Sequence, residues 1–187
     1  MSRSARGNYR NSGRSSPKGS KPEGDSEAFL DTTFLLPFFQ IDVSVEGFDL
    51  GGFKEFLMGL SKIHFSELSV FEAKAKLYRL RTKGGAYARA LEAFGHNLAI
   101  LRGDEKFAFH PYGARDDEYF NSILAKRFAL DGFDMVIMAQ AMSIGMLITE
   151  DEDILGLREQ GAFEGDPLFE NMRIRRWKEL EARGARH

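Results

Sequence analysis

The chain has 187 residues, of which 43% are hydrophobic and 12% aromatic, with a formal net charge of −2 and no cysteine. This composition is typical of one folded domain, and the absence of cysteine excludes disulfides, thiolate zinc sites and cysteine nucleophiles. No apolar run approaches the roughly 20 residues that span a bilayer, and the first residues lack the apolar core of a signal peptide, so we expect a soluble, cytoplasmic protein with no membrane partner.

The first 27 residues differ in composition from the rest of the chain. They are rich in Ser, Gly, Arg and Pro, and they carry six Lys or Arg against three acids. Such a segment cannot bury enough apolar surface to fold, so we expect residues 1–27 to be a disordered basic tail and residues 28–187 to be the folded domain. The charge of the tail suits a loose tether to RNA, although a solvated extension with no specific role is the simpler explanation.

After the tail, short apolar runs alternate with longer helical patterns. Strands are predicted at 28–31, 62–65, 106–110, 146–149 and 172–177, the last at a sheet edge. A short helical region broken at Pro37 and helices at 52–60, 66–81, 86–101, 116–129, 134–144 and 151–160 lie between them. The alternation predicts an α/β fold in three layers, with a short, mostly parallel sheet flanked by helices.

Four of these predicted elements begin or end at an acidic residue: Asp31, Glu72, Asp134 and Asp151. Asp31 and Asp151 end strands that should be parallel neighbours, and α/β sheets place their sites at such strand ends. Carboxylates gathered in one pocket repel each other unless a cation neutralises them. Oxygen ligands of this kind favour Mg²⁺ or Mn²⁺.

Each of the four acids also has an ordinary structural explanation. Glu72 fits a capping box that begins at Ser69, and the three aspartates fit the starts of helices, where acids cap exposed N–H groups. Two features favour a site. Asp134 leads a helix that is apolar on nearly every side and therefore buried, and a cap there needs no charge, whereas a metal ligand needs anionic oxygen.

The ordered set resembles the PIN domain, a family of metal-dependent ribonucleases. The resemblance covers roughly residues 28–177, and its most specific parts are the segments 29–33 (FLDTT), 134–141 and 147–153 (LITEDED). Thr33 is a departure, because the family more often carries Asn or Ser at that position. The resemblance implies a PIN-like three-layer fold.

The resemblance also implies a chemistry and partners. Asp31, Asp134 and Asp151 would hold one or two Mg²⁺ or Mn²⁺ ions, with Asp153 as a further ligand and Glu72 completing the catalytic pocket. The reaction would be metal-assisted hydrolysis of RNA by an endoribonuclease. VapC-type toxins of this family act as homodimers and are blocked by an antitoxin, so such partners are expected here. Because the chain is longer than a typical toxin of this kind and carries an unusual tail, a stand-alone RNA-processing nuclease is an open variant.

Two other functions remain open from the sequence. The chain could be a catalytically inactive PIN-like module that binds RNA or a protein, although a pure binder has no need of a repulsive pocket. A flap-nuclease-like DNA enzyme is less well supported, because the chain lacks the extra acids that this resemblance requires. Lys76, Arg79 and Lys83 share the helical face of Glu72, where they would either follow an RNA backbone or form a solvated face.

The histidines and Thr149 are the other polar residues that could serve a site. The four histidines share no metal-ligand spacing, and His64 is expected to be a hydrogen-bonded packing residue. Thr149 would either serve the site through its hydroxyl, for example by orienting Asp151, or simply end its strand.

Overall fold

The computed structural model describes residues 27–184. The predicted disordered tail lies outside the described residues, apart from Glu27, which opens the first strand one residue earlier than predicted. The elements in chain order are β1 (Glu27–Leu30), α1 (Thr32–Leu35), η1 (Leu36–Phe39), α2 (Leu50–Gly59), β2 (Lys62–Ser66), α3 (Glu67–Leu80), η2 (Arg81–Lys83), α4 (Gly85–Gly103), β3 (Phe107–His110), α5 (Ala114–Ala125), α6 (Gly132–Met142), β4 (Met146–Ile148), α7 (Glu152–Glu159), β5 (Arg173–Arg175) and α8 (Trp177–Gly184).

The five strands form one sheet in the order β3-β2-β1-β4-β5, and every neighbouring pair is parallel. The α/β prediction is therefore confirmed, with a sheet that is wholly parallel where a mostly parallel one was expected. The central strands read as unbroken apolar runs, because helices cover both of their faces. β1 shows this directly, since Ala28, Phe29 and Leu30 are all fully buried.

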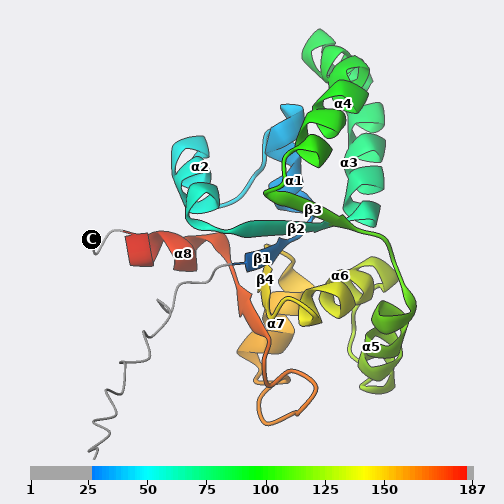
Figure 1. The fold of residues 1–187 in the computed structure, drawn as a ribbon, viewed down its shortest axis with the longest axis vertical. Coiled ribbons are helices and arrows are strands. Elements are labelled where there is room, and N and C mark those ends of the chain that lie inside the picture. The colour runs from blue at the N-terminus through cyan, green and yellow to red at the C-terminus, as the bar shows by residue number, and fades with distance from the viewer. Residues whose placement is uncertain (1–26, 185–187) are drawn as a thin grey trace, which may run out of the picture.

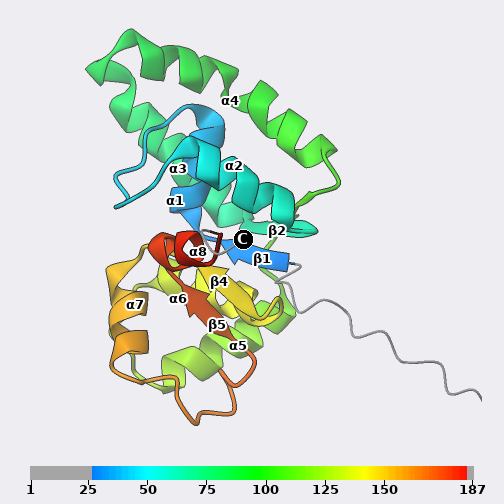
Figure 2. The same ribbon diagram turned by 90° about the vertical axis from the view of Figure 1, so that its left-hand side faces the viewer.

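Helices lie on the two faces of the sheet, which gives three layers (Figures 1 and 2). On one face, Leu30 and Ile148 pack with residues of α1 to α4. On the opposite face, Phe29 and Leu147 pack with residues of α5, α6 and α7. Because successive residues of a strand point to opposite sides, each strand contributes to both cores.

The C-terminal part of the described chain differs from the prediction. The expected strand at 172–177 is shorter, since β5 spans Arg173–Arg175 at the sheet edge and Trp177 begins the helix α8. Trp177 is 1% exposed and packs among phenylalanines of the first core. The sequence predicted Trp177 to end a strand, whereas in the structure its side chain packs the start of α8 against the core.

None of the helices in the part of the chain that the structure describes has the length and apolarity to span a bilayer.

Candidate functional site

The sheet has a point at which its strand order reverses. From β1 the chain continues outward through β2 and β3, and then returns to place β4 on the other side of β1. In open parallel sheets, ligands bind at this switch point, outside the carboxyl ends of the strands. Asp31 directly follows β1, and the segment 149–151 follows β4, so the topology places these residues side by side.

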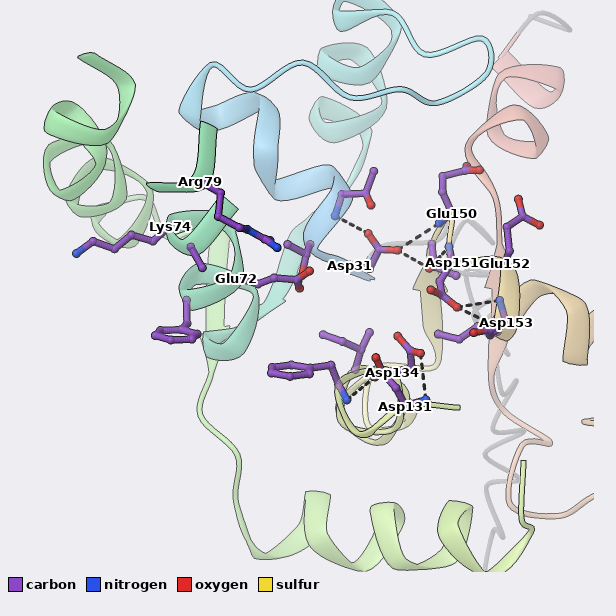
Figure 3. A pocket seen from close by; sticks show the side chains of 18 of the residues that line it. Asp31, Glu72, Lys74, Arg79, Asp131, Asp134, Glu150, Asp151, Glu152 and Asp153 are labelled. Atoms are coloured by element: carbon purple, nitrogen blue, oxygen red, sulfur yellow. Dashed lines mark hydrogen bonds between the residues drawn. The ribbon is translucent and has the colours of Figure 1, made fainter. Parts of the chain in front are cut away.

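A cleft of about 1110 Å³ opens at this switch point. Residues of α1, α3, α4 and α6 and of the β4–α7 connection line it (Figure 3). Eight of the lining residues are acids: Asp31, Glu72, Asp131, Asp134, Glu150, Asp151, Glu152 and Asp153. The structure therefore brings all five of the sequence-predicted site residues into one pocket, here called the acid pocket.

Asp31 is the most deeply buried of these acids, with 8% of its surface exposed. Its carboxylate caps α1 by accepting a hydrogen bond of 2.7 Å from the backbone N–H of Thr33. It also accepts the backbone N–H of Glu150 at 3.2 Å and the hydroxyl of Thr149. Burial raises the pKa of Asp31 to about 6, although these hydrogen bonds to the carboxylate oppose the shift.

Thr149 joins the two strand ends through its fully buried hydroxyl. The hydroxyl donates to Asp31 and accepts the backbone N–H of Asp151 at 2.9 Å. The sequence left open whether Thr149 serves the site or simply ends its strand. The structure favours the first of these roles, because the hydroxyl bonds the carboxylate of Asp31 and the backbone N–H of Asp151. Thr149 thus fixes the relative positions of two predicted site residues.

Asp151 is the N-cap of α7, and one oxygen of its carboxylate accepts the N–H groups of Asp153 and Ile154, each at 3.0 Å. A carboxylate fixed in this way keeps its second oxygen available for another partner. Asp153 lies in the first turn of the same helix and is exposed. The short spacing between a cap and its first turn therefore aims two carboxylates at one region.

Asp134 lies in the first turn of α6, where Asp131 and not Asp134 is the N-cap. The Asp131 carboxylate accepts the N–H groups of Phe133 and Asp134, at 2.7 and 2.9 Å, and Asp134 returns the bond by accepting the N–H of Asp131 at 3.4 Å. The reading of Asp134 as an N-cap is corrected, because α6 begins two residues earlier than predicted. This capping box turns the half-buried Asp134 into the pocket.

The three carboxylates of Asp134, Asp151 and Asp153 gather closely, with one oxygen of each lying within 4.8 Å of the others. Asp31 lies in the same pocket but outside this set. Burial, and next the charge of Asp151, raises the pKa of Asp134 to about 7. Among residues 27–180, no Lys, Arg or His forms an ion pair with these four aspartates. The pocket thus holds hard anionic oxygens that no cation of the described side chains pairs with, and this donor set fits Mg²⁺ or Mn²⁺.

Glu72 approaches from the opposite wall, on α3. Its carboxylate accepts the hydroxyl of Thr32 at 2.7 Å, and it points toward the Asp31 side of the pocket (Figure 3). The predicted capping box from Ser69 is wrong, because α3 begins at Glu67 and Ser66 is its N-cap. Glu72 therefore lies in the second turn of the helix, where it has no capping role.

The basic residues of α3 are arranged differently from the prediction. Arg79 lines the pocket and extends toward Glu72 and Asp31, whereas Lys76 and Lys83 do not line it. Lys74 reaches the pocket wall with its stem, but its ammonium group lies 5.8 Å from the centre of the Phe94 ring and points away from the acids. Only Arg79 of the predicted basic face therefore faces the site.

Two histidines meet outside the pocket. His64 Nδ1 lies 2.7 Å from His110 Nε2, and its other ring nitrogen lies 3.1 Å from a carboxylate oxygen of Glu27. The prediction that His64 is a hydrogen-bonded packing residue is confirmed, since it is 6% exposed. Sequence spacing did not reveal its pairing with His110, because the two residues come from neighbouring strands and are 46 residues apart.

The sequence reasoning also missed three exposed aromatic side chains at the pocket, Phe71, Tyr78 and Phe133. The sequence of α3 did contain an indication of this exposure. Phe71 and Tyr78 are seven residues apart and therefore share a helical face, which lies outside the buried face that contains Val70 and Leu77.

Comparison with known proteins leaves the family of the chain unassigned. No protein-family model and no curated protein matches it. Among solved structures, the chain is similar to one titled as VapBC2 from Rickettsia felis bound to a DNA fragment from their promoter, with 13% sequence identity over 81% of this chain and 98% of that chain. The TM-score of this pair is 0.49, so the functional argument depends on the geometry of the site itself.

Proposed function

We propose that the chain is a metal-dependent ribonuclease that hydrolyses RNA phosphodiester bonds in the acid pocket. The observation that carries this proposal is the set of three carboxylates within 4.8 Å, with no described cation paired to them, at the switch point of a parallel sheet. The mutual repulsion of such clustered acids destabilises the fold, because each charge raises the free energy of the others. A site that binds a divalent cation uses the same charges productively.

Asp134, Asp151 and Asp153 would hold the cation, Mg²⁺ or Mn²⁺, and Asp31 is proposed as a further ligand on the strand side. When bound, the ion would supply Lewis-acid stabilisation of the phosphate and acidify the attacking water. This chemistry requires no nucleophile from the protein, because the attacking group would be the acidified water.

The protein's own part is to hold the oxygens in position before the substrate arrives. The N–H groups at the start of α7 fix one oxygen of Asp151, and the capping box of α6 fixes Asp134. Thr149 and the N–H of Thr33 fix Asp31 from two directions. Carboxylates that are already ordered cost less conformational entropy when they bind an ion. Glu72 would complete the catalytic set from α3.

RNA as the substrate is proposed from the resemblance of the segments 29–33, 134–141 and 147–153 to the PIN domain. The same resemblance supports two further proposals, a homodimer and an antitoxin-like protein partner. A stand-alone RNA-processing nuclease needs neither, and the site geometry is the same in both cases.

Cleavage of RNA tests the proposal. Labelled RNA that contains single-stranded and paired regions is incubated with Mg²⁺, Mn²⁺ or EDTA, using the full chain and the Asp134→Asn variant. We expect cleavage only with metal, and a loss of about 100-fold or more in the variant, because one anionic ligand is replaced by a neutral amide. Asp42→Asn is the matched control, since Asp42 is an exposed acid outside the pocket.

Metal binding separates the possible failures. Mn²⁺ binding can be followed by the loss of the paramagnetic signal of free Mn²⁺, without any substrate. Metal binding without cleavage of RNA would direct the search to another phosphodiester. Unchanged cleavage by Asp134→Asn would disprove the assigned site, and no binding of metal would favour the non-catalytic binding module.

A further inference from the structure

Two aromatic rings stand exposed at the acid pocket and contact no other ring of the described residues. Phe71 is 69% exposed and Phe133 is 51% exposed, and both line the pocket. Among the described residues, neither ring takes part in a ring–ring or cation–π contact, although most phenylalanines of this chain do. Tyr78, the third exposed ring, already has the Arg81 guanidinium stacked 3.5 Å from its centre.

The position of Phe71 is not explained by the packing of α3. The buried stripe of this helix contains Val70, Ala73 and Leu77. Phe71 precedes Glu72 and lies outside the stripe, on the side that faces the pocket. An exposed phenylalanine gives up most of the stabilisation that burial of its ring would contribute. The packing of the isolated chain therefore does not account for an aromatic ring at this position.

Phe133 occupies the corresponding place on the other wall. It lies in the first turn of α6, one residue before Asp134, while Phe71 lies one residue before Glu72 on α3. The two rings thus lie on separate elements that both supply acids to the pocket. A flexible molecule that reaches the carboxylates would pass both rings.

Arg79 adds a charge requirement. It lines the same pocket, extends toward Glu72 and Asp31, and forms no ion pair with a described residue. A guanidinium in this place can donate two parallel hydrogen bonds to a phosphate. A ligand that satisfies both rings and Arg79 must carry flat unsaturated groups and negative charge along one chain. Unpaired nucleotides have this chemistry.

We propose that Phe71 and Phe133 are stacking platforms for unpaired bases of an RNA strand, with Arg79 on an adjoining phosphate. The identity of the polymer rests on the function proposed above. Bases inside a duplex are stacked on each other and offer no free face, whereas unpaired bases stack readily on aromatic side chains.

Binding measured without catalysis tests this proposal. Fluorescence anisotropy in EDTA compares three labelled ligands of equal length: a single-stranded RNA, the same sequence as a duplex, and an abasic strand with the same phosphates. For each ring replaced in Phe71→Leu or Phe133→Leu, we expect the dissociation constant of the single strand to rise roughly 5- to 100-fold. The abasic strand should be unaffected, because leucine preserves apolar volume but removes the ring.

Three further variants sharpen the result. Phe71→Trp keeps a stacking surface and should bind the single strand at least as well as the unmodified chain. Tyr112→Leu makes the matched aromatic-to-leucine change at an exposed ring outside the pocket, and it should have no effect. Arg79→Gln should weaken the intact and abasic strands by the same factor, because both carry the phosphate.

The failure of this inference is distinguishable from the failure of the nuclease proposal. Ring-dependent binding of single strands by a chain that never cleaves RNA would support the stacking platforms and reject the nuclease. Metal-dependent cleavage with unchanged single-strand binding in both leucine variants would reject the platforms and point to a protein that covers the rings. Equal loss for the intact and abasic strands, or no binding of any strand, would also overturn the platforms.

Discussion

Asp31 shows how much of this site depends on single hydrogen bonds. Its carboxylate is nearly enclosed, and burial raises its pKa to about 6, yet it accepts hydrogen bonds from Thr33, Thr149 and Glu150. The three donors hold the carboxylate in one orientation. The residue is therefore positioned by groups that no substrate or metal needs to touch.

The Thr149 hydroxyl is the first testable member of this arrangement. Thr149→Val keeps the shape of the side chain but removes its donor and acceptor, so Asp31 loses one partner and the N–H of Asp151 loses its acceptor. We expect the free energy of unfolding to fall by about 1–3 kcal/mol, because two buried polar groups lose their partner. RNA cleavage should fall more than this loss of folded protein explains.

Thr149→Ser provides the control, since serine keeps the hydroxyl. Urea unfolding and metal-dependent cleavage, measured on both variants, should show recovery with serine. A positioning role requires that kcat recovers together with Mn²⁺ affinity. Cleavage that is equal in the valine and serine variants would show that the hydroxyl serves only the fold.

At the residue scale, the sequence predicted the acids but not their local roles. Asp31, Asp134 and Asp151 follow or open elements as expected, and all reach one pocket. Which acid caps α6 depends on where its first turn begins, and sequence patterns locate helix ends only to within a few residues. Asp131, which was not among the predicted site residues, is the N-cap that orients Asp134.

At the element scale, α8 ties the end of the described chain to the site. The carboxylate of Glu150 accepts the N–H of Trp177 at 2.5 Å, while the backbone N–H of Glu150 donates to Asp31. The indole of Trp177 packs against Phe34 and Phe53 and donates to the carbonyl of Gly47 at 3.2 Å. The helix thus holds the α1–α2 connection and the β4–α7 connection together.

Loss of the indole should loosen this region. Trp177→Ala removes a side chain that is 1% exposed, so we expect the free energy of unfolding to fall by about 3–5 kcal/mol. Circular dichroism during urea unfolding measures this change, because the variant lacks the only tryptophan of the chain and gives no tryptophan fluorescence.

Trp177→Phe is the matched variant. It keeps an aromatic ring in the core but loses the hydrogen bond to Gly47 and part of the indole volume, so the cost should be below that of the alanine variant. Alanine and phenylalanine variants of equal stability would contradict the placement of Trp177 in the core.

The element scale also shows why the alternation of strands and helices was predictable while the C-terminal boundary was not. Apolar strands and amphipathic helices differ in period, and those periods are visible locally. The sequence predicted residues 172–177 to be one strand. The change to a helix at Trp177 depends on the Glu150 carboxylate, 27 residues away, which accepts the first N–H of α8.

At the scale of the whole molecule, two groups of ionisable side chains oppose each other as the pH changes. Burial lowers the pKa of His64 and of His110, which favours the neutral rings. The unfolded chain takes up these protons more readily, so the histidines reduce stability as the pH falls below about 6.5. The acid pocket acts in the opposite direction, because the pKa values of Asp31 and Asp134 are raised.

Asp134→Asn isolates the contribution of the acid pocket. Its folded pKa of about 7 exceeds the ordinary value of 3.8, so the cost of its charge is complete above pH 7 and disappears as the pH falls toward 4. In EDTA at pH 8 we expect the variant to be more stable by on the order of 1–2 kcal/mol after allowance for solvent screening. This gain corresponds to a Tm higher by roughly 2–8 °C.

Thermal unfolding across pH 4 to 8 measures the difference between the two chains. The advantage of Asp134→Asn should shrink below pH 7 and vanish near pH 4. Saturating Mn²⁺ should stabilise the unmodified chain more than the variant, since the proposed ion would bind the folded state through this carboxylate. Asp42→Asn should follow the unmodified chain at every pH, and a Tm difference for Asp134→Asn that does not depend on pH would contradict the pKa assignment.

The sequence by itself determined the α/β class and five of the eight acids that reach the pocket. These properties depend on local periods and on residue types at element ends. The tertiary structure decided what lies next to what. Asp31 and Thr149 are 118 residues apart, and only the return of β4 to the side of β1 brings them together. Tertiary structure also decided the pairing of His64 with His110 and the placement of two exposed rings at the pocket. Contacts between distant segments depend on strand order and helix packing, which no local pattern encodes.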